Sequence, residues 1–250
     1  MPDRSPQPGD RAEEPVPVAG QSVLVTGAAQ GLGAALARHF HGLGARLTLL
    51  DRDGDGLAQI VAACPGATSA VVDLADAEAT ARAIAEVVTG PVDTLIHNAA
   101  ILRVEPLEAV TLDTFQATLN VGIQAAFQLT KAVWPGMKER GGSLVFVSSR
   151  SGIEGFADET GYCAAKHALE GFSKCLSMEG ESHGILSVTI TPGMFMHTPM
   201  SETTYPPELR EKWVDPILLA PAFSYLATRP MQLSGQRLDA WALSKQESDS

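Results

Sequence analysis

Short apolar runs rich in β-branched residues alternate along the chain with longer stretches of helical periodicity. Glycine, proline or charged residues bound each run, as they bound strands that are buried on both faces of a parallel sheet. The pattern predicts strands at residues 22–26, 45–50, 67–72, 92–97, 143–148, 186–191 and 236–241.

Between these runs, apolar residues recur every three or four positions, which predicts helices at residues 32–43, 58–62, 77–88, 111–138, 161–180 and 217–228. Pro135 is expected to bend the longest helix or to begin its last turn. Strands that alternate with helices are typical of βαβ units. We therefore expect an α/β fold, with a single-domain, Rossmann-like, doubly wound parallel seven-stranded sheet and helices on both faces.

The length of 250 residues and the hydrophobic content of 45% suit one large domain and are tight for two. Residues 1–19 hold five prolines and several charges without an apolar core, so we expect a disordered N-terminal tail. The folded catalytic domain is expected at 20–243, and a C-terminal tail at 244–250. The apolar runs are shorter than the roughly 20 residues of a membrane-spanning helix, so no membrane span is expected.

The net charge of -11 argues against a nucleic-acid or anionic-membrane partner, because both require a face rich in Lys and Arg. Three cysteines, Cys64, Cys163 and Cys175, are an odd number without metal-ligand spacing. This predicts free thiols, no metal site and a reducing, cytoplasmic location.

A glycine-rich turn joins the first predicted strand to its helix, with the spacing G-x-x-x-G-x-G. Such glycines let backbone N–H groups and the helix N-terminus approach a pyrophosphate, although an ordinary turn remains the alternative. Asp51 ends the second strand about 20 residues farther on, where a dinucleotide-binding fold places its ribose acceptor. The combination predicts a dinucleotide cofactor bound at Gly27, Gln30, Gly31, Leu32, Gly33 and Asp51.

Asp51 also bears on the choice of cofactor. A carboxylate accepts hydrogen bonds from a ribose 2′-hydroxyl and repels a 2′-phosphate, which favours NAD over NADP. Arg52 supports the alternative, because an arginine at this corner stacks on adenine or reaches a phosphate. Gln30 supplies no charge to the turn. We expect NAD, with Arg52 among the cofactor contacts.

Tyr162 and Lys166 lie four residues apart, which places them on one face of a helix. The spacing is common, and a surface tyrosine beside a solvated lysine is the alternative. A cation about 4 Å from the phenol is worth about 4 kcal/mol at an effective dielectric of about 20, or about three pKa units. Lys166 is therefore expected to lower the pKa of Tyr162 from about 10 to about 7, where the phenol serves as an acid or base.

From Gln21 to Trp241 the chain resembles the short-chain dehydrogenases/reductases. Ser149 precedes Tyr162 by 13 residues, as the catalytic serine does in that family. The other ordered matches are T-G-x-x-x-G-x-G at 26–33, Asp73-Leu74, His97-Asn98-Ala99-Ala100 in place of N-N-A-G, Asn120 in L-N-V, Pro192-Gly193 and Thr198.

The resemblance implies an oxidoreductase that interconverts a secondary alcohol and a ketone with NAD(H). Tyr162 would exchange the proton, Ser149 would hydrogen-bond the reacting oxygen, and Lys166 would bind the nicotinamide ribose. Asn120 would support a water linked to Lys166. An NADP-dependent ketoreductase, a non-catalytic NAD-binding relative, and a lyase or epimerase remain alternatives. The helices at 111 and 161 pair between subunits in this family, which implies a homotetramer or homodimer.

Further cofactor contacts implied by the family are Asp73, Leu74, Asn98, Ala99, Ala100, Tyr162, Lys166, Pro192, Gly193 and Thr198. Several positions depart from the family pattern. Ala100 replaces a glycine, and Thr198 follows Gly193 by one residue more than usual, with His197 at the regular position. The segment that ends at Trp241 lacks the common V-D-G-G, so the C-terminal wall of the pocket is expected to differ.

Substrate contacts are expected from Ser149, Arg150, Tyr162 and Met194. Arg150 would clamp a carboxylate or phosphate; alternatively it turns into solvent and pairs with Glu154 or Asp158. Residues 194–214 mix methionines, aromatics and prolines, which suits a mobile apolar lid over a hydrophobic or moderately large carbonyl compound.

Overall fold

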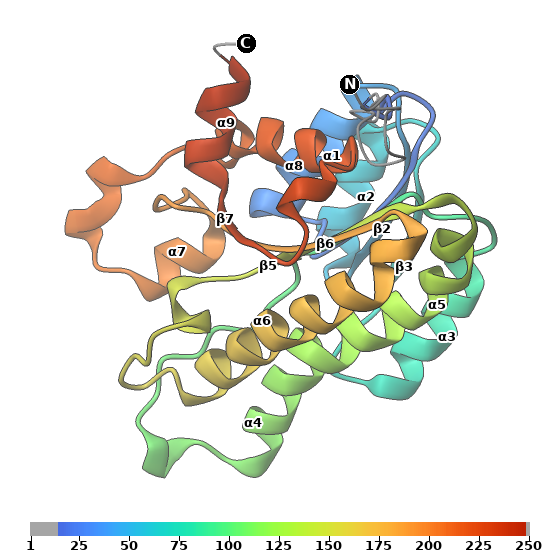
Figure 1. The fold of residues 1–250 in the computed structure, drawn as a ribbon. Coiled ribbons are helices and arrows are strands. Elements are labelled where there is room, and N and C mark those ends of the chain that lie inside the picture. The colour runs from blue at the N-terminus through green and yellow to red at the C-terminus, as the bar shows by residue number, and fades with distance from the viewer. Residues whose placement is uncertain (1–14, 249–250) are drawn as a thin grey trace, which may run out of the picture.

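The computed structural model describes residues 15–248, which form a seven-stranded parallel sheet in the order β3-β2-β1-β4-β5-β6-β7 (Figure 1). The order reverses between β1 and β4, so the predicted doubly wound fold is confirmed. The strands are β1 (Ser22–Thr26), β2 (Arg46–Asp51), β3 (Thr68–Val71), β4 (Thr94–His97), β5 (Gly142–Val147), β6 (Ile185–Thr191) and β7 (Arg237–Asp239).

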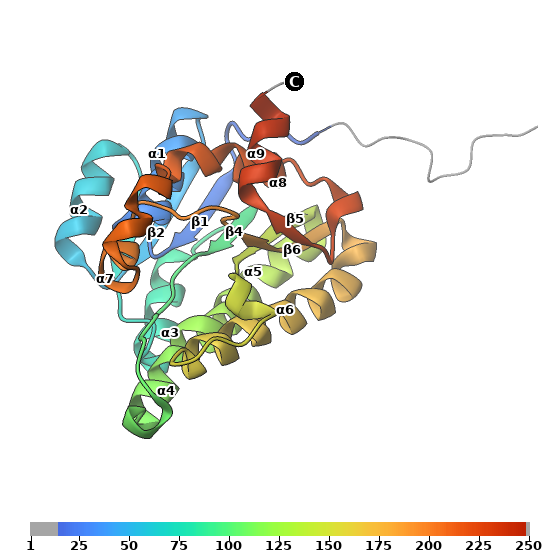
Figure 2. The ribbon, with the colours of Figure 1, turned by 90° about the vertical axis from the view of Figure 1, so that its left-hand side faces the viewer.

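Helices cover both faces of the sheet (Figure 2). Val23 and Val25 of β1 pack under one layer, while Leu24 between them packs under the other, because successive strand residues point to opposite faces. The first layer contains α1 (Gly31–Gly42), α2 (Gly54–Ala63), α8 (Ala220–Ala227) and α9 (Ala240–Ser248). The second contains α3 (Ala77–Val87), α5 (Ala125–Arg140) and α6 (Thr160–Gly180), and α4 (Leu112–Leu119) lies against α6.

The helix predicted at 111–138 is interrupted. A π-helical turn, Asn120–Gln124, separates α4 from α5, and Pro135 lies inside α5. The helix predicted at 217–228 is also divided, into a 3-10 helix (Pro216–Leu219) and α8. The π-helical turn depends on contacts with another part of the fold, and Pro221 lies in the first turn of α8; hydrophobic periodicity registers neither feature.

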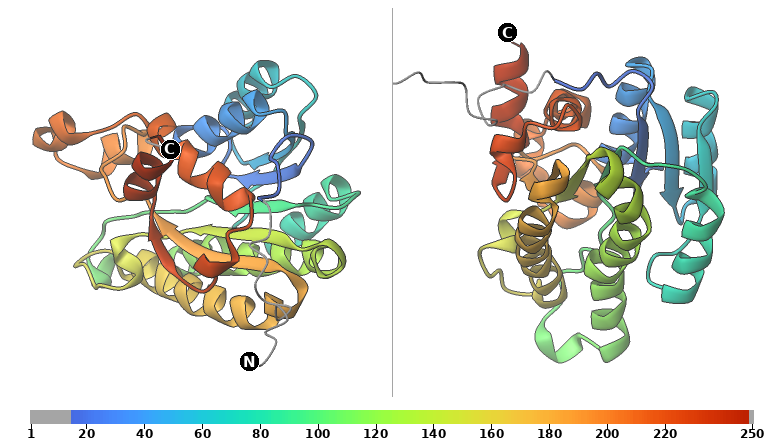
Figure 3. Two further views of the ribbon diagram at one scale, coloured as in Figure 1. Left: turned by 45° about the horizontal axis from the view of Figure 1, so that its top comes forward. Right: turned by 45° about the vertical axis from the view of Figure 1, so that its right-hand side comes forward.

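Both predicted tails need correction. Residues 1–14 of the N-terminal tail lie outside the described residues, but Val16 donates its N–H to the Thr228 carbonyl and Val18 packs against the core. Residues 244–248 of the predicted C-terminal tail belong to α9, which packs beside α8 (Figure 3). Ser244 is buried there and donates its hydroxyl to the Leu219 carbonyl. Among the described helices, none is long and apolar enough to cross a membrane.

The π-helical turn is held by His97, the fully buried last residue of β4. Its Nε2 lies 3.0 Å from the Val121 carbonyl oxygen and 3.1 Å from that of Gly122. Since both partners only accept, Nε2 carries the proton, and Nδ1 accepts from the Thr26 hydroxyl at 3.1 Å. Burial, and secondarily the charge of Lys166, lowers the pKa of His97 to about 4. The imidazole is therefore neutral at physiological pH.

Neutral burial of His97 predicts a pH-dependent loss of stability. Between pH 6.5 and 4 the unfolded chain takes up a proton at this residue and the folded chain does not, so the free energy of unfolding falls by up to about 3 kcal/mol. His97→Gln removes this dependence. In denaturant titrations, the stability advantage of wild type over His97→Gln is expected to shrink by about that amount from pH 7 to pH 4.

The exposed His167 provides a matched control. His167→Gln is expected to follow the pH dependence of the wild type throughout this range. A constant difference between wild type and His97→Gln from pH 7 to pH 4 would contradict the neutral, buried state of His97.

Candidate active site

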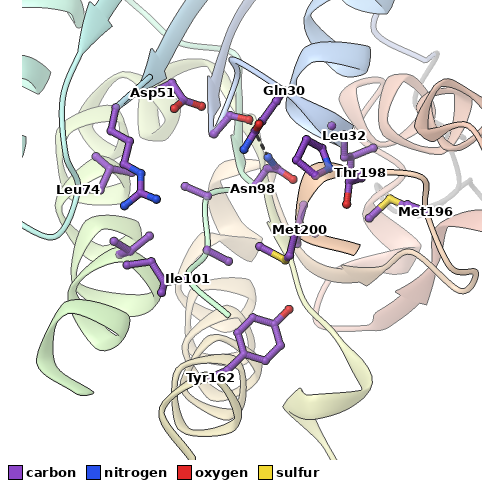
Figure 4. Close-up of a pocket in the computed structure, with 18 of the residues that line it drawn as sticks. Gln30, Leu32, Asp51, Leu74, Asn98, Ile101, Tyr162, Met196, Thr198 and Met200 are labelled. Carbon is purple, nitrogen blue, oxygen red and sulfur yellow. Dashed lines mark hydrogen bonds between the residues drawn. The ribbon is translucent and has the colours of Figure 1, made fainter. Parts of the chain in front are cut away.

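A cleft lies beyond the carboxyl ends of the strands, where the strand order reverses between β1 and β4 (Figure 4). Its empty space of about 1020 Å³ includes open solvent. Asp51 borders it at one end and Tyr162 at another. The predicted site residues that line it are Gly27, Gln30, Gly31, Leu32, Asp51, Arg52, Asp73, Leu74, Asn98, Ala99, Ala100, Tyr162, Lys166, Pro192 and Thr198.

The turn between β1 and α1 leaves no room for a side chain at Gly27 or at Gly33. Gly27 has a φ of +66°, and a Cβ there would lie 2.9 Å from Asn98 Nδ2; a Cβ on Gly33 would lie 1.9 Å from the Gly27 carbonyl oxygen. Asn98 fixes the turn by donating Nδ2 to the Thr26 and Gly27 carbonyls, each at 3.1 Å. The first turn of α1 holds no acidic residue. Close backbone approach and an uncompensated helix N-terminus fit the pyrophosphate of a dinucleotide.

Gly33 itself does not line the cleft, because it packs against the turn and allows close contact between helix and strand. Gly193 also lies off the cleft lining. With a φ of +76°, it turns the chain after β6, and a Cβ there would lie 2.1 Å from Asp239 Oδ1.

Asp51 presents a fixed carboxylate to the adenosine end of the cleft. Its Oδ2 accepts from the Ala29 N–H and its Oδ1 from the Asp53 N–H, both at 2.9 Å. The side chain is therefore held in one orientation by the backbone on either side. Asp73 is oriented similarly by the Ala75 N–H at 2.9 Å, and buried Leu74 forms part of the same wall.

Lys166 is almost completely buried, with 2% of its surface exposed. Its Nζ donates to the Val147 carbonyl at 2.6 Å and lies over the ring of Tyr162, 5.4 Å from the ring centroid. Burial lowers the pKa of Lys166 to about 8, while the charge of Glu170 acts in the opposite direction.

The expected lowering of the Tyr162 pKa to about 7 is wrong for this arrangement. Burial raises the pKa of Tyr162 above its usual value, and a hydrogen bond with Ser149 offsets only part of that effect. The spacing predicted the Lys166 ammonium beside the phenol oxygen. In the structure the ammonium lies over the ring of Tyr162 and bonds to Val147. The phenol is protonated in this structure, the form that donates a proton.

The two adjacent serines at the end of β5 face different partners. Ser148 donates its hydroxyl to the buried carboxylate of Glu170. Ser149 faces Tyr162, and its hydroxyl also donates to Ser151 Oγ at 3.3 Å. Ser149 is therefore the serine that lies beside the Tyr162 hydroxyl, although the cleft lining includes Ser148 and not Ser149.

Asn120 begins the π-helical turn and does not line the cleft. Its Nδ2 donates to the Ala75 carbonyl at 2.7 Å, and its Oδ1 accepts from Gln116 at 3.2 Å. His97 supports the same turn from below, a role that the sequence analysis missed. Its only sequence signal was the histidine in place of the first asparagine of N-N-A-G.

Two predicted substrate contacts lie elsewhere. Arg150 pairs with Glu154 at 2.8 Å, and its side chain is 70% exposed, which matches the solvent-facing alternative. Met194 does not line the cleft, whereas Met196 and Met200 do (Figure 4). The reason is that Met196 forms a bridge to Val214, which fixes how the segment after β6 returns to the cleft.

Thr198 reaches the cleft despite its extra residue of spacing. It is buried, and a Cβ on Gly31 would lie 3.1 Å from its methyl group. Its hydroxyl accepts from the Ser201 N–H at 3.1 Å and caps α7 (Pro199–Thr204). His197, at the regular family position, points away and pairs with Glu202 at 2.8 Å.

The family model described as short chain dehydrogenase matches residues 21–208. The chain is 35% identical over 190 residues to L-xylulose reductase of Bos taurus, which covers 75% of this chain and 77% of the relative. It is 35% identical over 179 residues to D-erythrulose reductase of Gallus gallus, covering 71% and 72%. It is 33% identical over 181 residues to D-threitol dehydrogenase of Mycolicibacterium smegmatis, covering 69% of each.

Solved structures agree. A proposed NAD(P)-dependent gluconate 5-dehydrogenase of Beutenbergia cavernae with bound NADP superposes with a TM-score of 0.82 at 27% identity, covering 91% of this chain and 99% of that one. A short chain dehydrogenase of Shigella flexneri complexed with NADP gives a TM-score of 0.80 at 28% identity, covering 90% and 98%. With the glycine turn and the Tyr162–Lys166 pair on one cleft, the chain belongs to the short-chain dehydrogenase/reductase family of oxidoreductases acting on CH–OH groups.

Proposed function

We propose that this protein interconverts a secondary alcohol and a ketone with NAD(H), using Tyr162 as the proton donor and acceptor. The observation that carries the proposal is the convergence of Tyr162, Ser149 and buried Lys166 beside the cleft that the glycine turn and Asp51 also border. A non-catalytic NAD-binding relative would not need this set. A lyase or epimerase would show no net accumulation of NADH during alcohol turnover.

The bound nicotinamide would supply or accept the hydride. Tyr162, protonated by burial, donates its proton to the carbonyl oxygen in reduction and recovers it in oxidation. Ser149 hydrogen-bonds the same oxygen and stabilises its developing charge. Lys166 would hold the ribose hydroxyls with the donors that Val147 leaves free, and Asn120 at the π-helical turn would support a water on the proton path from Lys166.

NAD is proposed over NADP because Asp51 is fixed by two backbone N–H groups and cannot turn away from a 2′-phosphate without losing both. Arg52 on the same cleft favours the alternative, and two similar structures carry NADP. The remaining cofactor contacts proposed are the glycine turn, Asp73 to Leu74, Asn98 to Ala100, Pro192 and Thr198.

For the substrate, we propose a small ketose or polyol, the class named in L-xylulose reductase, D-erythrulose reductase and D-threitol dehydrogenase. Met196 and Met200 would border it from the segment 194–214, acting as a cover for the cleft. Arg150 is not required, since it already pairs with Glu154.

Tyr162→Phe is expected to lower kcat by at least about 100-fold, the contribution of a positioned acid–base group. NADH binding, measured by fluorescence, should stay within a few-fold of wild type because the ring and Lys166 remain. Tyr225→Phe in α8 is the matched control and should retain activity. Full turnover by Tyr162→Phe in a panel of ketoses and secondary alcohols would overturn the mechanism.

Asp51→Ser is expected to raise the ratio of kcat/KM for NADP to that for NAD by at least about tenfold, because a fixed negative charge is removed from the 2′ position. Asp55→Ser removes an exposed carboxylate from the first turn of α2, four residues later, and should leave the ratio unchanged. A wild-type protein that prefers NADP would refute the proposed role of Asp51.

We further propose a homodimer or homotetramer that pairs α5 and α6. Phe127 is 50% exposed on α5, and its ring lies 6.4 Å from that of Phe172 on α6. Light scattering should give a multiple of the chain mass of 26.3 kDa, and Phe127→Glu should shift it toward the single chain. Met178→Glu changes another exposed apolar residue, near the end of α6, and tests whether the loss of assembly is specific to Phe127. A wild-type mass of one chain would exclude the assembly.

A further inference from the structure

Arg237, in β7, reaches from the last strand of the sheet to the back of the catalytic residues. Its Nη2 donates to the Ser149 carbonyl at 3.1 Å, and its Nε lies 3.3 Å from Glu170 Oε1. The residue belongs to the segment in which this chain departs from the V-D-G-G ending of its family. One side chain thus donates a hydrogen bond to the main chain of Ser149 and forms an ion pair, without a hydrogen bond from Nε, with a carboxylate on α6.

Glu170 is the buried centre of this cluster, with 7% of its surface exposed. Ser148 donates to its Oε1, and Thr189 donates to its Oε2 at 2.7 Å. The carboxylate therefore ties together the ends of β5, β6 and β7 and the middle of α6. The surroundings are tightly packed, since a Cβ on Gly152 would lie 2.6 Å from Ser148 Oγ and 3.1 Å from Glu170 Oε1.

Stability alone is a weak reason for such a pair. Two charges brought into the interior lose hydration, and apolar residues of similar volume often stabilise a fold as well or better. The position of Glu170 suggests another reason. It follows Lys166 by one helical turn, and it is the acidic group whose charge opposes the effect of burial on Lys166.

The other groups around Lys166 do not supply this charge. His97, on β4, is neutral and buried, and Tyr162, on α6, is protonated. Arg237, on β7, is positive and forms an ion pair with Glu170. Glu170 is thus the acidic group whose charge acts on Lys166.

We propose that Arg237 and Glu170 are positioning residues for the reaction: Arg237 fixes the main chain of Ser149, and Glu170 provides the opposite charge that keeps the buried Lys166 an ammonium ion. This deepens the proposed function, on which the role of Ser149 rests. Neither residue lines the cleft. Both act through Ser149 and Lys166.

The two halves of the pair have opposite electrostatic effects, which makes the proposal testable. Glu170→Gln keeps the shape and removes the negative charge, so the pKa of Lys166 should fall by about one unit from its value near 8. Arg237→Met removes the positive charge and should raise that pKa. NMR titration of lysine Cε carbons in the cofactor-free protein measures both shifts, with the Lys166 signal identified by its loss in Lys166→Met.

Turnover provides the second readout. Arg237→Met should lower kcat about tenfold or more, because Ser149 loses its main-chain support, with the KM for NAD within about threefold of wild type. The lysine in Arg237→Lys keeps the positive charge but cannot reach both Ser149 and Glu170. This variant should therefore restore the Lys166 titration without restoring kcat. The exposed pair Glu78 and Arg82, replaced as Glu78→Gln and Arg82→Met, should change neither quantity.

Lys166 titrations that match wild type in both variants, or that shift in the same direction in both, would overturn the proposal. Wild-type kcat in Arg237→Met would overturn its Ser149 part. The NMR titration needs no turnover, so it stands even if the protein proves to be inactive on alcohols and ketones. Failure of the proposed function is thereby distinguished from failure of this inference.

Discussion

The burial of the Lys166 ammonium is the constraint around which the catalytic end of this protein is organised. A buried ammonium loses its hydration and survives only with close partners. The protein provides the Val147 carbonyl at 2.6 Å and the carboxylate of Glu170 one turn away. It also keeps the buried imidazole of His97 neutral, so that His97 adds no second positive charge near the lysine.

The same burial determines the state of Tyr162. In the dry environment that holds Lys166, the phenol keeps its proton, and Ser149 is the group that acts to stabilise the phenolate. Because burial disfavours the phenolate, Tyr162 gives up its proton when a partner oxygen accepts it. Proton transfer is thus tied to the arrival of substrate, which a tyrosine with a pKa near 7 would not ensure.

The sequence predicted best those features that depend on local pattern. Strand β1 begins and ends as expected at 22–26, because a central parallel strand is a continuous apolar run. The glycine turn and Asp51 border the cleft as spacing indicated. Arg150, expected among the substrate contacts, instead forms the exposed ion pair with Glu154, one of the two partners that the alternative named.

Features that depend on distant contacts escaped prediction. The π-helical turn that breaks the helix at Asn120 is held by His97, which the chain reaches more than 20 residues earlier. Arg237 meets Ser149 only because β7 closes the sheet beside β6, and no local pattern shows that contact. The direction of the Tyr162 pKa was wrong because burial, a property of the whole fold, raises it more than the Ser149 hydrogen bond lowers it.

Thr26 connects two ends of the cleft. Local sequence patterns predicted the cofactor end, whereas the catalytic end depends on contacts between distant parts of the chain. Its hydroxyl accepts from the N–H groups of Asn98 and Ala99, and it lies 3.1 Å from His97 Nδ1. A hydroxyl has one proton to donate, and here that proton goes to His97. The imidazole must then direct Nε2–H at the π-helical turn. Because β1 and β4 pair at Thr26 and His97, the strand-order reversal that opens the cofactor cleft also fixes the helix carrying Asn120.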